Sequence, residues 1–360
     1  MFDYSASQFP DIVRLELTNT CNMQCPHCRH HAPDKKLPEN YPEYYKNQTH
    51  MTENQVASIL DEIRDNGSKN VTLNVANEPT VAPTFKFAVE RLKANGLVGT
   101  FNTNGLKLND EFCQHLVDYD FDSVNISIDA TKPETLKKAR GITALDKLVR
   151  NVERLIKIRG EKMFPRVGVT FVIMPYNEDE VWDFINFWKT RADVIRFTGY
   201  ITDGKPDATV LPGVEKHEIP PRIPCKQIFK DIVIRANGDV TPCVITAESP
   251  HYHSMGNIFG DGGIKAVWNG PEFKKWREAH NTGCWNGISY CKGCDYWLDS
   301  FNVKEKVSDD FIIRSPSPYT VFYNVKDKMF NWDKNSLIER QGFGDHQDSG
   351  KMSSISSYDI

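Results

Sequence analysis

The chain has 360 residues, which is long enough for one large α/β domain and a smaller second one. Its net charge of −4 and its 26% of charged residues give no reason to expect a nucleic-acid partner or an anionic membrane surface. No apolar run approaches the roughly 20 residues of a membrane helix, and the N-terminus lacks the basic start and apolar core of a signal peptide. We therefore predict a cytoplasmic protein.

Strand patterns and helix patterns alternate through about the first 200 residues. The strand candidates are residues 11–18, 70–76, 97–105, 122–130, 166–174 and 193–200. The helix candidates between them are residues 52–67, 84–96, 110–119, 133–139 with 145–160, and 179–191. Six β–α repeats predict a parallel sheet with right-handed crossovers, either open or curled into a barrel.

Polar and apolar residues alternate within these strands, and this alternation favours the barrel. A strand covered by helices on both faces should be apolar throughout. In residues 122–130, however, apolar side chains alternate with Asn125, Ser127 and Asp129. We therefore predict a partial (β/α)6 barrel that lines a wet lumen, with its chemistry at the C-terminal strand ends. The polar strand residues expected to face the substrate are Arg14, Glu16, Asn74, Asn125, Arg196 and Thr198.

From about residue 205 the pattern changes, because proline and glycine become frequent. Residues 230–243, KDIVIRANGDVTPC, alternate like a hairpin that turns at an Asn-Gly pair. We predict a barrel over residues 1–210, a small cysteine-rich domain over 211–300 and an extension over 301–360. Periodicity is lost after about residue 300, and the polar end of the extension predicts disorder.

The chain has nine cysteines, and seven of them lie at short spacings. In a reducing compartment such spacings are typical of metal ligands or catalytic thiols and not of disulfides. Three of the seven, Cys21, Cys25 and Cys28, lie in TNTCNMQCPHCRHH (18–31), directly after the first strand. A structural zinc ion or a closed iron–sulfur cluster needs four ligands, so this set leaves one position open. A degenerate zinc knuckle is the alternative.

The spacing Cys-x3-Cys-x2-Cys after a first strand resembles the signature of the radical S-adenosylmethionine (radical SAM) superfamily. This resemblance implies that the three thiolates hold a 4Fe–4S cluster whose fourth iron is chelated by S-adenosylmethionine. It also implies that an electron from a flavodoxin- or ferredoxin-type donor starts the reductive cleavage of S-adenosylmethionine to a 5′-deoxyadenosyl radical. The cofactors would carry the chemistry, and the protein would place them and exclude water.

Further positions match the same family in order along the chain. Where the family's second strand ends in Gly-Gly-Glu-Pro, this chain has Ala76, Asn77, Glu78 and Pro79, so both glycines are lost. The resemblance implies that the backbone there holds the methionine amino group. It implies further cofactor contacts from His27, Asn102, Asn104, Ser127, Asp129 and Arg140.

Two other features lie close to the three cysteines. His30 and His31 are more typical of solvated loop residues than of metal ligands. The tyrosine-rich residues 37–50 form a candidate lid, with a plain surface loop as the alternative.

Four more cysteines form a second set. Cys225, Cys243, Cys291 and Cys294, with GNI at 256–258 and VWNGPEFKKWR at 267–277, resemble the short form of the SPASM domain, called twitch. The resemblance implies one auxiliary 4Fe–4S cluster with four protein ligands, and a zinc ribbon is the alternative.

Two cysteines belong to neither set. Cys113 lies on the apolar side of a helix, which predicts a buried structural thiol. Cys284, in a loop between glycines, is either inert, an extra ligand or a catalytic hydrogen-atom donor.

Three functions remain open. The first, which we favour, is an oxidoreductase that oxidises or epimerises a carbinol of a sugar or aminocyclitol-like small molecule, with the auxiliary cluster or Cys284 completing the reaction. The second is epimerisation or crosslinking of a ribosomal peptide. Because the first strand begins near residue 11, there is no room ahead of it for a leader-binding domain, and this weakens the second function. The third is a non-enzymatic zinc- or iron-binding scaffold.

Overall fold

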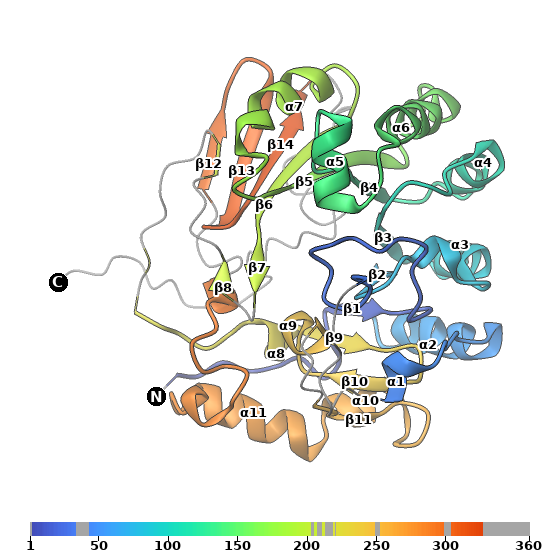
Figure 1. The fold of residues 1–360 in the computed structure, drawn as a ribbon. Coiled ribbons are helices and arrows are strands. Elements are labelled where there is room, and N and C mark those ends of the chain that lie inside the picture. The colour runs from blue at the N-terminus through green and yellow to red at the C-terminus, as the bar shows by residue number, and fades with distance from the viewer. Residues whose placement is uncertain are drawn as a thin grey trace.

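Six parallel strands, adjacent in chain order, form the centre of a twelve-stranded sheet that does not close (Figure 1). The computed structural model describes residues 2–33, 43–202, 205–206, 211–212, 219, 221–248, 253–298 and 304–326. The six strands are β1 (Ile12–Leu15), β2 (Asn70–Thr72), β3 (Val98–Thr103), β4 (Ser123–Ser127), β5 (Arg166–Ile173) and β6 (Val194–Gly199). This arrangement confirms the predicted α/β fold with a partial barrel.

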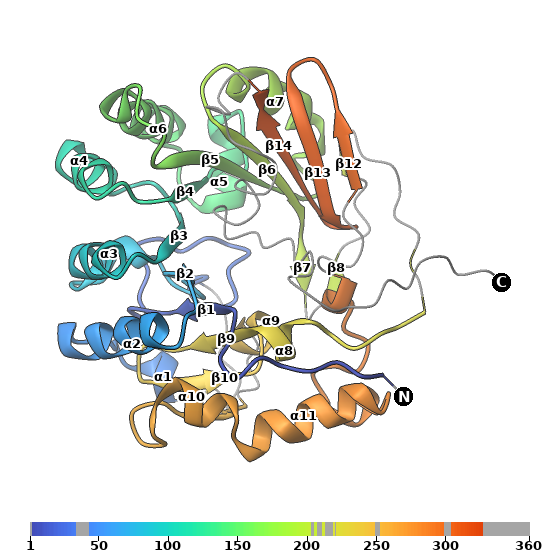
Figure 2. The ribbon, with the colours of Figure 1, turned by 180° about the vertical axis from the view of Figure 1, so that it is seen from behind.

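Helices follow the strands as the sequence predicts, and several stand in a row along the outer side of the sheet (Figures 1 and 2). The helices of this half are α1 (Glu43–Lys46), α2 (Glu53–Asp65), α3 (Phe85–Ala94), α4 (Asp110–Asp118), α5 (Pro133–Arg140), α6 (Leu145–Arg159) and α7 (Val181–Trp188). Two 3₁₀ turns, η1 (Pro79–Val81) and η2 (Glu178–Glu180), accompany them. The described residues contain no helix of the length and apolarity required to cross a bilayer.

Local sequence explains where these helices begin and end. At the start of α2, the Thr52 hydroxyl accepts the Gln55 N–H while the Gln55 side chain accepts the Thr52 N–H, a reciprocal cap worth about 1 kcal/mol. At the start of α5, Pro133 needs no hydrogen-bond partner for its nitrogen. The same helix ends at Gly141, whose φ of 77° suits glycine and stops the helix beside the cysteine loop.

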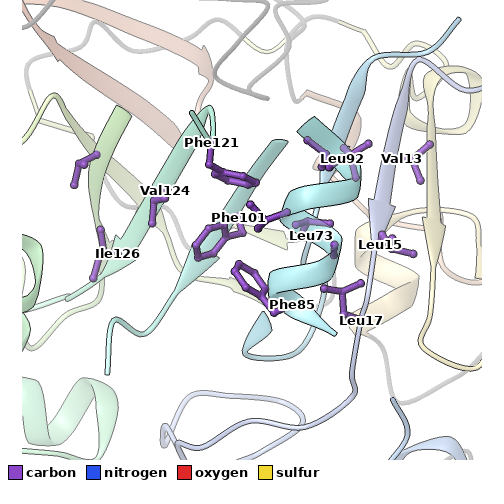
Figure 3. Packing of buried hydrophobic residues seen from close by; sticks show 14 of the residues in the cluster. Val13, Leu15, Leu17, Leu73, Phe85, Leu92, Phe101, Phe121, Val124 and Ile126 are labelled. Atoms are coloured by element: carbon purple, nitrogen blue, oxygen red, sulfur yellow. The ribbon is translucent and has the colours of Figure 1, made fainter. Parts of the chain in front are cut away.

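The main core lies between the sheet and its outer helices (Figure 3). Phe85 of α3 packs edge-to-face on Phe101 of β3, with ring centroids 5.0 Å apart, and Phe121 packs on Phe101 at 5.3 Å. Each fully buried side chain of this kind contributes about 1.5–3 kcal/mol. Gly99 is required here, since an added Cβ would lie 2.6 Å from the Phe121 ring. This packing holds the strands in place beneath the loops that carry the site.

The inner face of the sheet is polar but packed. Glu16, Thr72, Thr100, Asn125 and Thr170 are all buried, and the Thr72 and Thr100 hydroxyls lie 3.2 Å apart in a hydrogen bond. The predicted wet lumen is therefore limited to the C-terminal strand ends, because polar side chains from adjacent strands fill the space between the strands.

The second half of the chain extends this sheet at both edges. At one edge β9 (Asp231–Ile234) pairs in parallel with β1 and continues into β10 (Asp239–Thr241) and β11 (Gly256–Asn257). The hairpin turns at Asn237–Gly238, as predicted, with Gly238 at a φ of 87°. The helices here are α8 (Gln227–Lys230), α9 (Val244–Glu248), α10 (Gly263–Trp268) and α11 (Pro271–Asn281), with turns η3 (Trp285–Gly287) and η4 (Tyr296–Leu298).

At the other edge, β14 (Thr320–Val325) pairs antiparallel with β6, followed by β13 (Phe311–Ser317) and β12 (Lys304–Val307). The loss of periodicity predicted after residue 300 therefore does not hold for residues 304–325. A small separate hairpin joins β7 (Ile201–Thr202) to β8 (Lys205–Pro206). The polar end expected to be disordered, residues 342–360, lies outside the described residues. The domain boundaries remain predictions, and the sheet itself continues across both of them.

Candidate functional site

A cavity of about 390 Å³ lies at the C-terminal ends of the parallel strands. The three thiols of Cys21, Cys25 and Cys28 line it. Eight of the residues expected to contact the cofactor line the same cavity: His27, Ala76, Asn77, Glu78, Asn102, Asn104, Ser127 and Arg140. Pro79 and Asp129 are buried and are not among its lining residues. The fold thus brings together side chains that are more than 100 residues apart in the chain.

The cysteine loop is held by the ends of neighbouring strands and helices. The Glu78 N–H, after β2, donates to the Thr20 carbonyl at 3.0 Å. The Asn104 side-chain amide, after β3, donates to Asn22 Oδ1 at 2.7 Å. After α5, Gly141 approaches the Gln24 carbonyl so closely that an added Cβ would lie 3.1 Å from its oxygen. The positions of the three thiols therefore depend on three separate β–α units.

Glu78 is a buried anchor and not a free carboxylate. Its oxygens accept hydrogen bonds from the Thr80 N–H (3.2 Å), the Thr80 and Thr103 hydroxyls (both 2.7 Å) and the Asn104 N–H (2.7 Å). Burial raises the pKa of the Glu78 carboxyl, and these donors partly offset that rise. Glu78 thus ties the end of β2 to the end of β3 at the cavity wall.

The stretch that replaces the family's two glycines is not strained. Among the described residues other than glycine, only Asp120 and Asp129 have a positive φ. Ala76 and Asn77 therefore have backbone angles that do not require glycine at these positions. The Asn77 Oδ1 accepts the Val75 N–H at 3.0 Å and closes the turn. His31 Nε2 donates to the Ala76 carbonyl at 3.1 Å. His31 is therefore a wall residue of the cavity and not the solvated loop histidine that the sequence suggests; His30 lines the cavity as well.

Asp129 contacts the site through Arg140. Its Oδ2 lies 2.5 Å from Arg140 Nη2, and its Oδ1 accepts the Val172 N–H at 2.7 Å. Asp129 adopts a φ of 65°, a conformation that aspartate tolerates better than most residues. Arg140 Nη1 in turn lies 3.9 Å from Cys25 Sγ, so Asp129 positions a guanidinium beside a thiol.

Burial shifts the pKa values of the ionisable side chains that line this cavity. Burial raises the pKa of Cys21 to about 12. Burial also raises the pKa of Cys25, and Arg140 partly opposes this rise. Burial and then Arg140 lower the pKa of His27, so its ring is neutral at pH 7.

The cavity wall contains buried polar atoms that have no hydrogen-bond partner within the described chain. Among them are His27 Nδ1 and Asn77 Nδ2. Buried polar atoms of proteins almost always have a partner, so these two fit a polar ligand in the cavity. Three thiols, one guanidinium and two unsatisfied polar atoms are a donor set that suits a three-thiolate cluster together with S-adenosylmethionine.

The four thiols of the second set line a smaller, more enclosed cavity. Its wall also contains the aromatic residues Trp276, Tyr290, Tyr296 and Trp297 and the buried His280. Burial raises the pKa of Cys294 to about 11 and raises those of Cys225, Cys243 and Cys291 as well. No three His, Cys, Asp or Glu side chains of the described residues are grouped so as to bind a single metal ion. The thiols of each set instead surround a cavity.

The two remaining thiols occupy different settings. Cys113 is buried in the core, as predicted, and burial raises its pKa to about 12. Cys284 is exposed and lines neither cavity. A hydrogen-atom donor must reach the substrate, so the position of Cys284 does not support a catalytic role.

The two cavities share part of their walls. Ile245 and Tyr296 line both of them, and Val244 lines the first. Ile245 lies on α9, which begins directly after Cys243. The two thiol sets are thus separated by a layer of side chains that contacts both spaces.

Only some of the polar strand residues reach the cavity. Asn74, Arg196 and Thr198 line it, as expected. Arg14 instead forms an ion pair with Asp231 at 2.8 Å, and Glu16 and Asn125 are buried in the sheet interior. Tyr200, Ile245 and Tyr296 also line the cavity, and sequence patterns did not reveal them. The one available signal was for Tyr296, which lies two residues after Cys294 in the sequence.

A buried polar network links both halves of the chain below the cavity. Glu16 accepts the Tyr44 hydroxyl at 2.6 Å and the Ala76 N–H at 3.3 Å, and Arg235 Nη1 lies 3.8 Å from it. Tyr44 OH also accepts the Ala236 N–H at 3.0 Å. Tyr44 belongs to the predicted lid, of which residues 37–42 lie outside the described residues. Because Tyr44 is buried in this network, residues 44–50 are an anchored segment and do not form a lid.

Two family models match the chain. The radical SAM superfamily model matches residues 15–187, and the model of an iron–sulfur cluster-binding domain, SPASM, matches residues 225–295. The chain belongs to the radical SAM superfamily. Membership with a SPASM domain implies 4Fe–4S clusters and S-adenosylmethionine as cofactors. Membership of this family identifies the chain as a radical SAM enzyme.

Known relatives of this radical SAM chain have diverse activities. Mycofactocin maturase MftC of Mycobacterium tuberculosis is 24% identical over 79% of this chain and 77% of its own length. GTP 3′,8-cyclase of Lactiplantibacillus plantarum is 24% identical over 86% of both chains. Streptococcus suis SuiB, solved with its precursor peptide SuiA and also with S-adenosylmethionine, has a similar fold. Its peptide-bound structure matches 76% of this chain and 67% of SuiB with a TM-score of 0.59 and 12% identity.

Proposed function

We propose that this radical SAM enzyme abstracts a hydrogen atom from a residue of a peptide and then oxidises the resulting radical through the auxiliary cluster. The observation that carries the proposal is the pair of cavities with a shared wall. Ile245 and Tyr296 contact both spaces, so a radical formed in the first cavity lies one side-chain layer from the four thiols.

The residues of the first cavity suit binding of the cofactors. Cys21, Cys25 and Cys28 would hold the open cluster, and the backbone of Ala76 and Asn77 would accept the amino group of S-adenosylmethionine. Arg140, held by Asp129, suits the methionine carboxylate, and His27 suits the adenine. Bound together and reduced by one electron, these cofactors supply a 5′-deoxyadenosyl radical.

A peptide is the substrate class that the relatives support best. The maturase MftC aligns over most of both chains, and SuiB shares the fold and binds a precursor peptide. Neither the relatives described above nor the cavity favours the sugar or aminocyclitol that the sequence analysis preferred. We therefore give up that preference in favour of the peptide alternative.

The proposed reaction balances with one electron acceptor. The S-adenosylmethionine held beside Cys21, Cys25 and Cys28 would supply the acceptor of one hydrogen atom from the peptide. The cluster held by Cys225, Cys243, Cys291 and Cys294 would accept one electron from the peptide radical, and one proton would go to solvent. A new double bond or crosslink forms, and the product is two hydrogens lighter. A flavodoxin- or ferredoxin-type protein would supply the initiating electron.

The test compares the peptides of cells that express the parent enzyme with those of cells that express the Cys21→Ala, Cys25→Ala, Cys28→Ala variant. Mass spectrometry should find a peptide two mass units lighter only with the parent. Purified, reduced enzyme should also form 5′-deoxyadenosine faster when that peptide is added. If peptides are identical in both strains, and GTP or a small metabolite is consumed instead, the peptide assignment is wrong.

A further inference from the structure

One buried histidine contacts two of the four auxiliary thiol residues. His280 lies on α11, on the same helical face as Phe273, Trp276 and Arg277, and is fully buried. Its Nδ1 accepts the Cys225 N–H at 3.1 Å, and its Nε2 lies 3.5 Å from Cys291 Sγ. His280 therefore connects the first cysteine of the set to the third, from a helix that carries no cysteine.

The first of these contacts fixes the tautomer of the ring. A backbone N–H can only donate, so Nδ1 must present its lone pair and carry no proton. In the neutral ring the proton then lies on Nε2, which faces the sulfur of Cys291. The geometry assigns the second contact as an N–H···S hydrogen bond in which His280 donates.

We propose that His280 is a positioning residue that holds Cys291 and raises the reduction potential of the auxiliary cluster. The inference rests on the proposed ligation by Cys225, Cys243, Cys291 and Cys294. Hydrogen bonds to cluster sulfurs help to set the potential, because they favour the more negative, reduced state. Reduction adds one electron, which comes from the peptide radical in turnover or from dithionite in the test, and no bond to His280 breaks. His280 would thus make the second cluster a better acceptor of the substrate electron.

Two variants of the reconstituted holoenzyme separate hydrogen bonding from packing. His280→Phe keeps a ring but can neither donate nor accept, whereas His280→Gln offers an amide N–H and a carbonyl. In a redox titration followed by electron paramagnetic resonance, His280→Phe should lower the equilibrium constant for reduction of the auxiliary cluster about tenfold, which is about 59 mV for one electron. His280→Gln should recover most of that shift. The potential of the first cluster should stay unchanged in both.

The matched control is His253→Phe. His253 also packs on α11, with its ring 5.3 Å from that of Trp276, but it does not line the auxiliary cavity. Its replacement should leave the potential unchanged. An equal shift in His253→Phe would show that general packing, and not the N–H···S bond, is responsible, and would overturn the inference.

A measurement on the parent enzyme decides the matter if His280→Phe fails to fold. With ¹⁵N-histidine, pulsed electron paramagnetic resonance of the reduced auxiliary cluster should show one weakly coupled nitrogen, as expected through a hydrogen bond. A strong coupling would make His280 an iron ligand, and no coupling would remove it from the cluster. Either result overturns the inference. If His280→Phe keeps an intact four-iron auxiliary cluster with an unchanged potential, this inference is wrong and the proposed function still stands. If the four thiols hold zinc or no metal, the proposed function is wrong as well.

Discussion

The two thiol cavities differ in how they are enclosed, and this difference suits the separate tasks proposed for them. The three-thiol cavity has about 390 Å³, and its walls, built from a loop and several strand ends, carry thiol, amide and guanidinium groups. The four-thiol cavity is smaller and is enclosed by aromatic rings, among them Trp276 and Tyr290. The first cavity has the volume of a small-molecule pocket, whereas the second has thiol and aromatic walls that suit the proposed cluster with four protein ligands. These walls fit the proposed division of labour, with binding and bond cleavage at the first site and electron transfer at the second.

The largest effect is expected from removing the open site. The variant Cys21→Ala, Cys25→Ala, Cys28→Ala should form no detectable 5′-deoxyadenosine, because the cosubstrate loses the iron that binds it. Its iron content after anaerobic reconstitution should fall from about eight to about four per chain. Iron, sulfide and zinc analyses check this, with Cys284→Ala as the matched control for thiol loss. Zinc in either site, or full iron content in the triple variant, would contradict the assignment.

Removing the closed site should have a more selective effect. Cys291→Ala with Cys294→Ala should keep the formation of 5′-deoxyadenosine, because the three-thiol cavity does not use these residues. The peptide product should be lost, since its radical has no acceptor. Chromatography of 5′-deoxyadenosine and mass spectrometry of the peptide separate the two steps. If both steps fail together while the first cluster is intact, the two cavities are not independent.

A smaller effect, on stability, is expected where the two regions meet. Arg235→Met would leave the Glu16 carboxylate buried without its cation, and breaking a buried pair costs about 3–5 kcal/mol. Denaturant unfolding of the parent and variant measures the change in the free energy of unfolding. The double variant Glu16→Gln, Arg235→Met removes both charges and should regain a large part of that loss. A double variant as unstable as Arg235→Met would show that the charge is not the cause.

The parts of this molecule that were predictable from sequence are those encoded by local patterns. The six parallel strands and their helices have clear periodicity, capping residues and helix-ending glycines, and the two cysteine sets have short spacings. Strand β13 was missed because two of its inward residues, Ser315 and Ser317, are polar and hide its alternation. They are buried where β13 lies in the sheet, and its place there depends on the pairing of β14 with β6, a contact between distant segments.

The same reasoning explains which site residues escaped sequence analysis. Glu16 and Arg235 are 219 positions apart and form their pair only because β9 docks beside β1. His280 occupies the apolar face of α11 at the spacing of Phe273 and Trp276, which marks it as buried but says nothing about its neighbours. Chain-local signals thus locate ligands and turns, whereas contacts between elements far apart in the chain require the fold.

A modest effect on stability is expected at Asn77, one of the two residues that replace the family's glycines in the wall of the three-thiol cavity. Asn77→Gly should not improve binding of S-adenosylmethionine, because Asn77 does not have positive φ and its Oδ1 closes the turn at Val75. The glycine variant loses this cap and gains unfolded-state entropy, which should cost about 0.5–1 kcal/mol of stability. Equilibrium binding of S-adenosylmethionine and denaturant unfolding check both parts. Tighter binding in the variant would show that the asparagine is a compromise at this position.

The smallest effect is expected at Cys284, whose loop lies outside both cavities. Its thiol is exposed and lies 3.8 Å from the Thr282 carbonyl, so Cys284→Ala should change the free energy of unfolding by less than about 0.5 kcal/mol. Product formation should also be unchanged, because the proposed oxidation ends with electron transfer and needs no returning hydrogen atom. In D2O the parent enzyme should give a product two mass units lighter than the substrate, with no deuterium at the reacting carbon. An epimerase behaves in the opposite way, since a thiol that has exchanged with solvent returns its hydrogen to the radical. A product of unchanged hydrogen count that carries one deuterium, lost together with product formation in Cys284→Ala while 5′-deoxyadenosine persists, would replace oxidation by epimerisation.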